Sequence, residues 1–455
     1  MGYIALLFSA AVTLWLLRKD VAIRGRMPPA LWIPFLWFLM YSSRPIAQWF
    51  GGGGGSEEEG SLLDASVQFL LIAAAFVVLG RRGFQWGRLG SWNPAFFILF
   101  LYFVISIVWT IYPFVTCKRL YKEFGNVLVI LVVLTEADPA AALKMIYIRC
   151  AILWFPLSEV LIRWFPSYGR QYGNSGFGTV SGVTTQKNSL GQMCAFFCLV
   201  ILWDIVDRYR DRKRGVSDSS LWPQAIVFAM GIFLLWQSQS MTSLLAFVIG
   251  ATIFLSSKLK PIRQFPAFSA KSFFLATVIG LVATSVWTVS VAPLIESMAR
   301  DATFTERTKI WNTVLDQNIN PLIGCGFFSF WLEKGPSVWR EFYNFRMNNA
   351  HCGYLEMYLD GGAIGCALLG IYLIFTSWRA ANQFSNENTF SRALFAMIMM
   401  ALVINFSETC FFRLGIVWCS LIVATLATYP LLLHRLAGEE ASPPDNVGVV
   451  REIAY

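Results

Sequence analysis

The sequence is poor in charged residues. Asp, Glu, Lys and Arg make up 14% of its 455 residues, whereas about a quarter is usual in a soluble domain. Apolar residues make up 56%, which is more than a water-soluble fold of this size can bury. A soluble enzyme of two or three globular domains is therefore excluded. A disordered or fibrous chain is excluded as well, because such chains contain few apolar residues.

The motifs of several common enzyme classes are missing. With only two histidines, His351 and His434, a metal centre built from several histidines is impossible. Nine cysteines are present, but most lie inside apolar runs and no C-x-x-C occurs, so neither disulfides nor a zinc site is predicted. The chain has no Walker motif and no G-x-G-x-x-G, and its predicted outer loops lack an Asp-x-Asp pair. We expect neither a cofactor nor a metal.

Long apolar runs are what the sequence has in abundance. A helix that crosses a bilayer needs about 20 apolar residues, and thirteen runs of roughly this length can be marked. They are the segments 2–17, 30–50, 62–80, 93–112, 120–135, 142–163, 188–206, 222–238, 241–257, 272–292, 352–377, 393–410 and 414–434. The sequence therefore predicts an all-α, polytopic helical membrane protein with twelve to thirteen transmembrane helices.

Lysine and arginine in the short loops indicate the orientation, because they are enriched on the cytoplasmic side. The basic loops alternate with the other loops when thirteen spans are counted, which places the N-terminus outside and the C-terminal tail inside. These loops are 18–26, 81–88, 208–214, 258–271 and 379–392. The net charge of +9 comes largely from them, so it reflects topology and does not indicate nucleic-acid binding.

Four regions follow from this topology. Residues 1–292 hold the first ten transmembrane helices, and residues 293–350 form one large outer loop. Residues 351–436 hold the last three helices, and the polar segment 437–455 is predicted to be a disordered cytoplasmic tail. A second outer segment, 164–187, is rich in Gly and Tyr.

The large outer loop contains a predicted amphipathic helix over 304–317. Thr303 and Glu306 form the T-x-x-E pattern of a capping box. Arg307 falls on the apolar stripe of this helix, and a guanidinium on a buried face needs an anionic partner. That partner is either an anionic ligand or an acid of the protein. The protein acids considered are Asp301, Glu306 and Glu341.

His351 lies where the large loop meets the next apolar run. Histidine is the usual general base near neutral pH, so His351 is a candidate for catalysis. The alternative is a histidine that anchors the loop through a backbone hydrogen bond. His434 lies beside Arg435 at the cytoplasmic end of the last run, where a residue at the lipid headgroups is expected.

Further cations occur in the outer segments, although Lys and Arg are usually enriched in the cytoplasmic loops. They are Lys118, Arg119, Lys122, Arg170 and Lys187. Cations at bilayer depth are costly unless they are paired or face an anionic ligand. Some pair locally, as Lys122 can with Glu123, but together they indicate a groove for a phosphate carried on a lipid, which Arg binds through two hydrogen bonds and Lys as a point charge.

Longer motifs extend through nearly the whole chain. They are Arg307-Thr-Lys-Ile-Trp311, Pro321-Leu-Ile-Gly-Cys-Gly326, Ala350-His351-Cys-Gly-Tyr354-Leu355-Glu356, Lys118-Arg119-Leu-Tyr-Lys122-Glu123, Gln186-Lys187-Asn188 and Asn405-Phe-Ser407-Glu408. This pattern resembles the O-antigen ligase and polysaccharide polymerase family, and most closely its exopolysaccharide-production branch. The resemblance implies a helical, metal-independent glycosyltransferase of the bacterial inner membrane. Such enzymes take glycan from a polyprenyl-pyrophosphate carrier on the periplasmic side and pass it to lipid A core, to a growing polymer or to protein.

The resemblance also implies roles for single residues. Arg307 matches the loop arginine of the family and His351 its catalytic histidine. Two positions depart from the family pattern: Glu306 stands where Gly is common, and Cys352 stands where Asn is usual. The second departure affects how the acceptor is held. We expect His351 to take a proton from an acceptor hydroxyl, which then displaces polyprenyl pyrophosphate with inversion at the anomeric carbon.

Other functions remain open at this point. The same family includes protein O-oligosaccharyltransferases, and polymerase and ligase are not separated by the sequence. A transporter or flippase of a lipid-linked glycan or a small anion would also explain the outer cations, but it explains less well a loop with an arginine helix followed by a lone histidine. Partners expected besides donor and acceptor are membrane lipids and proteins of polysaccharide assembly and export.

Overall fold

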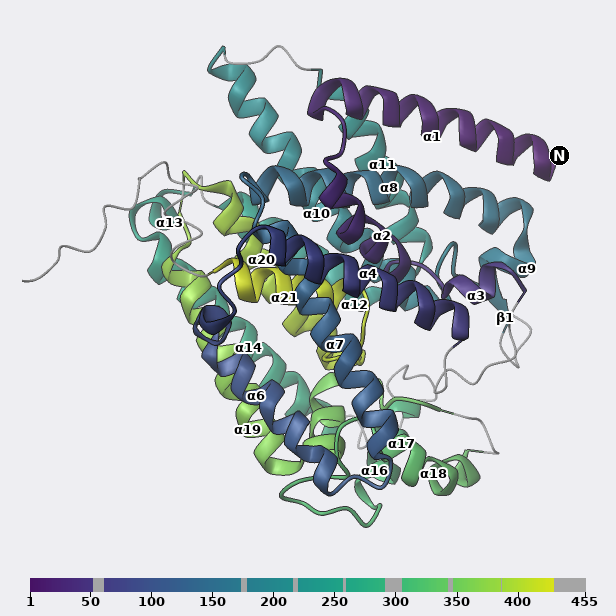
Figure 1. Ribbon diagram of the computed structural model, residues 1–455, viewed down its shortest axis with the longest axis vertical. Helices are drawn as coiled ribbons and strands as arrows, with labels where there is room; N and C mark the ends of the chain where they lie inside the picture. The colour runs from purple at the N-terminus through teal and green to yellow at the C-terminus, as the bar shows by residue number, and fades with distance from the viewer. Residues whose placement is uncertain are drawn as a thin grey trace, which may run out of the picture.

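The protein folds as a bundle of helices (Figure 1). The computed structural model describes residues 1–51, 61–172, 178–215, 220–256, 259–290, 305–342, 347–385 and 387–428. Within them, the strands β1 (Arg170–Tyr172) and β2 (Gly178–Val180) form one antiparallel pair. The longer helices are α1 (Gly2–Arg24), α2 (Trp32–Tyr41), α4 (Leu62–Arg81), α6 (Pro94–Ile105), α7 (Pro113–Leu134), α8 (Pro139–Trp164), α10 (Lys187–Lys213), α11 (Trp222–Gln237), α12 (Met241–Leu255), α14 (Pro266–Ser290), α16 (Thr305–Leu315), α19 (Gly353–Asn382), α20 (Thr389–Ser407) and α21 (Ile416–Ala427).

The helices confirm a multi-pass helical membrane protein. Six described helices are long and apolar enough to cross a membrane, or seven if the bent pair Trp86–Trp92 and Pro94–Val108 is one span. Four further apolar helices in the described ranges have 10–17 residues. Each of the thirteen predicted runs overlaps a helix. The count of twelve to thirteen spans depends on the shorter helices and also on α1 and α7, and it stays a prediction.

Burial separates central from peripheral helices. All residues of α20 from Thr389 to Asn405 are buried, as expected for a helix that is apolar on all sides and lies inside a bundle. Helices α8 and α10 are also mostly buried, whereas α4 and α14 leave most of their apolar stretches exposed. In a membrane these exposed stretches face lipid.

Ion pairs join segments that the sequence assigns to the cytoplasmic side. Arg24 at the end of α1 binds Asp20 at 2.7 Å and Asp204 of α10 at 2.6 Å. Arg208 also binds Asp204, at 2.7 Å. The loops after α1 and after α10 therefore begin at the same end of the bundle, in agreement with their predicted orientation.

Part of the large loop is helical. Helices α16, α17 (Phe330–Glu333) and α18 (Gly335–Glu341) gather at the lower end of the molecule in Figure 1. The predicted helix 304–317 is observed as α16, which is described from Thr305 and ends at Leu315, two residues earlier than expected. The predicted cap residue Thr303, the segment 293–304, His434 and the tail 437–455 lie outside the described residues.

Candidate active site

A break in helix α19 holds the large loop that carries Arg307. Gly362 has φ 60° and ψ −161°, which no helical residue adopts. The turn 321–326 fits into the break and replaces the interrupted helical hydrogen bonds with four of its own. These run from Cys325 N to Leu359 O at 3.0 Å, from Gly326 N to Asp360 O at 2.9 Å, from Ala363 N to Pro321 O at 2.9 Å and from Ile364 N to Leu322 O at 3.0 Å. The motif Pro321–Gly326 thus fixes the large loop to the membrane-spanning bundle.

Replacement of Gly362 by alanine is expected to destabilise this junction by about 1–3 kcal/mol, because a side chain in this backbone region is strained. The added Cβ would also lie 2.3 Å from the carbonyl carbon of Leu322. Thermal unfolding of the detergent-solubilised protein measures the effect. Gly370→Ala is the matched control, because Gly370 lies in the same helix with open space around it. Equal stability of the two variants would contradict the structural role of the break.

His351 lies in a strained turn just before α19. Its φ is 50°, a left-handed conformation that is uncommon for a residue other than glycine and often marks a functional position. The backbone N–H donates to Asn349 Oδ1 at 3.0 Å. The side chain is 30% exposed, while its Nδ1 is buried, makes no hydrogen bond and lies 3.7 Å from Glu408 Oε2. The predicted alternative, an imidazole anchored by a backbone bond, is not observed at this nitrogen.

Glu408 joins the candidate residues. It follows the end of α20, and its side chain is only 7% exposed. One carboxylate oxygen, Oε1, accepts from Arg307 Nη2 at 3.0 Å and from Asn188 Nδ2 at 2.6 Å. The other oxygen faces His351, and the backbone C=O accepts from Gly353 N at 3.1 Å. Glu408 therefore connects α10 and α16 through its carboxylate, and the start of α19 through its backbone, with the end of α20.

The partner of Arg307 corrects one prediction. The sequence argument considered only nearby acids, whereas the observed partner is Glu408, 101 positions along the chain. Glu341 accepts a hydrogen bond from Thr313 Oγ1 at 3.1 Å. Asp301 and the side chain of Glu306 lie outside the described residues. An acidic residue at the end of an apolar run was the signal that could have identified Glu408, because such residues are costly in a membrane unless they have a function.

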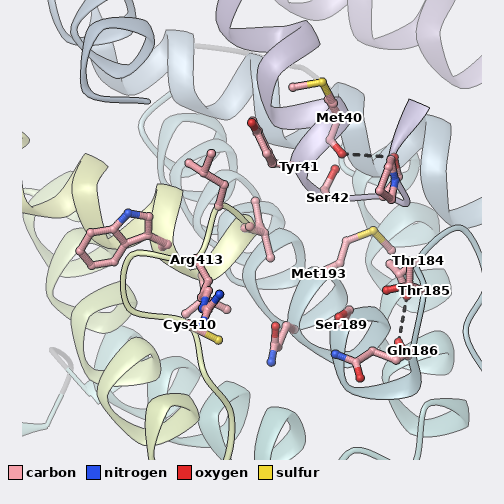
Figure 2. A pocket seen from close by; sticks show the side chains of 18 of the residues that line it. Met40, Tyr41, Ser42, Thr184, Thr185, Gln186, Ser189, Met193, Cys410 and Arg413 are labelled. Carbon is pink, nitrogen blue, oxygen red and sulfur yellow. Dashed lines mark hydrogen bonds between the residues drawn. The ribbon is translucent and has the colours of Figure 1, made fainter. Parts of the chain in front are cut away.

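A cavity of about 420 Å³, here called the first cavity, lies beside Glu408. Its charged lining residues are Asp64, Lys122, Glu408 and Arg413, and Asn349 connects it to the turn that carries His351. Figure 2 shows three groups of side chains around it. The first is Met40 and Tyr41 of α2 with Ser42 directly after that helix, the second is Thr184, Thr185, Gln186, Ser189 and Met193, and the third is Cys410 and Arg413. Most of this lining can donate or accept hydrogen bonds, as a glycan requires.

A second cavity of about 360 Å³ adjoins the first, because Tyr41, Gln68, Lys122, Arg413 and Leu414 line both. The second cavity is the more cationic one. Its charged lining residues are Lys118, Arg119, Lys122 and Arg413 against one acid, Glu123. Phe328 lies between two of these cations, with its ring 4.2 Å from the Arg119 guanidinium carbon and 3.7 Å from that of Arg413.

The structure places the sequence-predicted site residues in two groups, one at Glu408 and one around the second cavity, and neither Arg307 nor His351 lines either cavity. Arg307 and His351 meet at Glu408, and Lys118, Arg119 and Lys122 line the second cavity. Lys187 begins α10 next to Asn188, but it does not line either cavity. Arg170 begins β1, where its Nε donates to Ile162 O at 3.1 Å, and it also lies outside both linings. Arg413 is a cavity cation that the sequence argument missed.

Other groups at the site are less suited to chemistry. Glu123 Oε2 accepts from Trp418 Nε1 at 2.7 Å, which gives this acid a structural partner besides its neighbour Lys122. Burial raises the pKa of the Cys325 thiol to about 12, so this cysteine stays protonated at neutral pH. Among the described residues, no group of three or more His, Cys, Asp and Glu side chains is placed to hold a metal ion.

Residues 225–370 match the model of the O-antigen ligase family. This segment of the chain is similar to the O-antigen ligase domain. A search of curated proteins finds none that matches the chain. The similarity to the O-antigen ligase domain supports a glycosyltransferase-type enzyme of the ligase and polymerase kind, with a lipid-linked glycan as donor and a saccharide as acceptor.

The matched residues contain Arg307, the turn 321–326 and His351. Glu408, Arg413 and the cations of α7 lie outside the matched segment but reach the same place in space. The matched segment is therefore completed by helices on both sides of it in the sequence.

Proposed function

We propose that the protein transfers glycan from a polyprenyl-pyrophosphate carrier to a saccharide hydroxyl on the periplasmic face of the bacterial inner membrane, as a polymerase or ligase. The observation that carries this proposal is the meeting of Arg307 and His351 on Glu408, at the edge of a cavity that continues into a cationic one. A base beside a site for an anionic leaving group is what a direct displacement needs. The periplasmic side follows from the loop charges.

His351 acts as the general base in this proposal. It takes the proton of an acceptor hydroxyl while that oxygen bonds to the anomeric carbon of the donor glycan. The bond between this carbon and the phosphate oxygen breaks, so polyprenyl pyrophosphate leaves with the electron pair. A single displacement of this kind inverts the configuration at the anomeric carbon. The proton on the imidazole then passes to water or to the departing phosphate.

Cations stabilise the charge that grows on the leaving group. Arg307, Lys118, Arg119 and Lys122 are the proposed ligands of the diphosphate. Fixed positive groups in a site that excludes most water contribute strongly to such reactions, because they need no reorganisation when the charge develops. Lys187 and Arg170 stay predictions as further ligands, since no observed contact connects either residue with the cavities.

Glu408 has the proposed role of a positioning residue. Its carboxylate holds the Arg307 guanidinium, and its second oxygen lies near His351 Nδ1. This charge orients the imidazole and stabilises the imidazolium that forms when the acceptor proton is taken.

Glu408→Gln is therefore expected to lower kcat by about tenfold to a hundredfold, a part of the ~10²–10⁴ that general base catalysis contributes. In a protein that already carries His351→Ala, the same change should cost less than about threefold, because groups that act as one unit are not additive. Steady-state kinetics of the single and double variants measure this coupling. Glu387→Gln, an exposed acid outside the proposed site, is the control. Equal losses in both backgrounds would contradict a role through His351.

The function itself is tested with detergent-purified protein, a labelled lipid-linked glycan and a saccharide acceptor, without any ion gradient. We expect the glycan on the acceptor and one equivalent of polyprenyl pyrophosphate released. If the donor stays intact in this assay but crosses the bilayer of reconstituted vesicles, the protein is a flippase and the proposal is wrong. Transfer to a protein hydroxyl but to no saccharide would instead identify a protein O-oligosaccharyltransferase.

A further inference from the structure

An open groove runs along the seam between α4 and α7, on the outer surface of the bundle. The two helices pack against each other, and the groove between them has a volume of about 530 Å³. Its apolar surface comes from Phe69, Leu70 and Tyr121, whose exposed fractions are 59%, 65% and 41%. Because α4 is a membrane-spanning candidate with most of its surface exposed, this groove faces the hydrocarbon of the bilayer.

The groove is continuous with the cavities of the candidate active site. Lys118 and Lys122 line both the groove and the second cavity, and Gln68 lines the groove and both cavities. Two ammonium groups thus lie where an apolar channel meets a polar, cationic one. The ligand that matches an apolar groove next to a cationic cavity is an amphiphile, with its anionic head in the cavity and its hydrocarbon chain in the groove.

A buried, unsatisfied amide at the junction is an independent sign of a ligand. Gln68 is only 6% exposed, and its Oε1 makes no hydrogen bond in the structure. The hydroxyl of Tyr41, which lines both cavities, is also buried without a partner. Buried polar groups of this kind are costly unless a ligand or water binds them.

We propose that the polyprenyl chain of the donor lipid leaves the active site between α4 and α7. The diphosphate lies at Lys118 and Lys122, and the first isoprene units lie against Phe69, Leu70 and Tyr121. This inference rests on the proposed function, because it names the path of the lipid part of the same donor. It makes the α4–α7 seam the lateral entrance through which the donor arrives from the bilayer and the spent carrier returns to it.

The test measures the binding of two probes to the purified full-length protein. One probe is a long-chain polyprenyl diphosphate that carries no glycan, and the other is inorganic pyrophosphate. Ser66→Trp fills the groove from its exposed wall. It should weaken binding of the lipid by about tenfold and change that of pyrophosphate by less than about twofold. Val77→Trp is the matched control, since Val77 is a 52% exposed residue of the same helix outside the groove. This variant should bind both probes as the unaltered protein does.

A second variant avoids added bulk. Leu70→Ala removes apolar contact only. It should weaken binding of the lipid by about threefold and leave binding of pyrophosphate unchanged. Unchanged lipid binding in both groove variants would overturn the proposed path and assign the groove to ordinary bilayer lipids. Equal weakening of both probes by Ser66→Trp would also overturn it, because the substitution would then act on the cations. If the unaltered protein binds neither probe, the proposed function itself is wrong.

Discussion

Replacement of His351 by alanine is expected to lower kcat for glycan transfer by about 10²- to 10⁴-fold, which is the usual contribution of a general base. The physical reason is that, of the three side chains observed next to the Glu408 carboxylate, only His351 can take the acceptor proton, since Arg307 is a permanent cation and Asn188 has no basic atom. KM for the donor should change little, because the diphosphate is held by other residues. Initial rates of the two purified proteins at equal concentration measure this loss. The amount of each protein in the membrane before purification should be equal.

The chain offers an internal control for this experiment. His434→Ala removes the only other histidine, which the sequence places at the cytoplasmic end of the last apolar run, and it should leave the rate of transfer unchanged. Transfer by His351→Ala at the normal rate would end the assignment of the base. A loss of similar size in His434→Ala would indicate a general sensitivity to histidine removal and contradict the same assignment.

Arg307→Ala is expected to lower kcat/KM by about 10²- to 10³-fold, the size of effect seen when one group that stabilises an anionic transition state is removed. The guanidinium lies 3.0 Å from Glu408, and the Arg307 side chain is 22% exposed, so this arginine can contact both the carboxylate and a ligand. Arg307→Lys keeps the charge but loses the planar pair of donors, and it should recover only part of the rate. Steady-state kinetics with varied donor separate the two variants.

Removal of Arg307 also leaves Glu408 without its cation, so stability must be measured alongside activity. Thermal unfolding in detergent serves this purpose. Arg163→Ala is the matched control, because Arg163 forms an ion pair with Glu159 at 3.2 Å but is 59% exposed, and such surface pairs contribute little. An Arg307→Ala protein that is folded and fully active would contradict the role of the loop arginine.

Composition and hydropathy predict much of the fold. Each apolar run becomes a helix because a chain in lipid must satisfy its own backbone hydrogen bonds. The break in α19 is harder to foresee, since Gly361-Gly362 reads as an ordinary part of an apolar run. Only the turn 321–326, folded into the break, supplies the partners that make the interruption stable.

The sequence also fails to show which distant residues meet at the site. Arg307 and His351 could be singled out from the sequence because a cation on an apolar stripe and a lone histidine are unusual there. Glu408 carried a signal as an acid at the end of an apolar run, but its contact with Arg307 could not be predicted, because helical periodicity relates residues three or four positions apart and says nothing about a contact across 101 positions. For the same reason the argument missed Arg413, which approaches the cations of α7 only in the folded chain.

The position of the diphosphate tests the central claim most directly. The measurement is a cryo-electron microscopy structure of the full-length protein with bound polyprenyl diphosphate. The account predicts density for the diphosphate in the second cavity, within contact distance of Lys118 and Lys122. Density instead in the separate cavity beside Arg24, Lys144 and Arg208, among residues assigned to the cytoplasmic side, would contradict it.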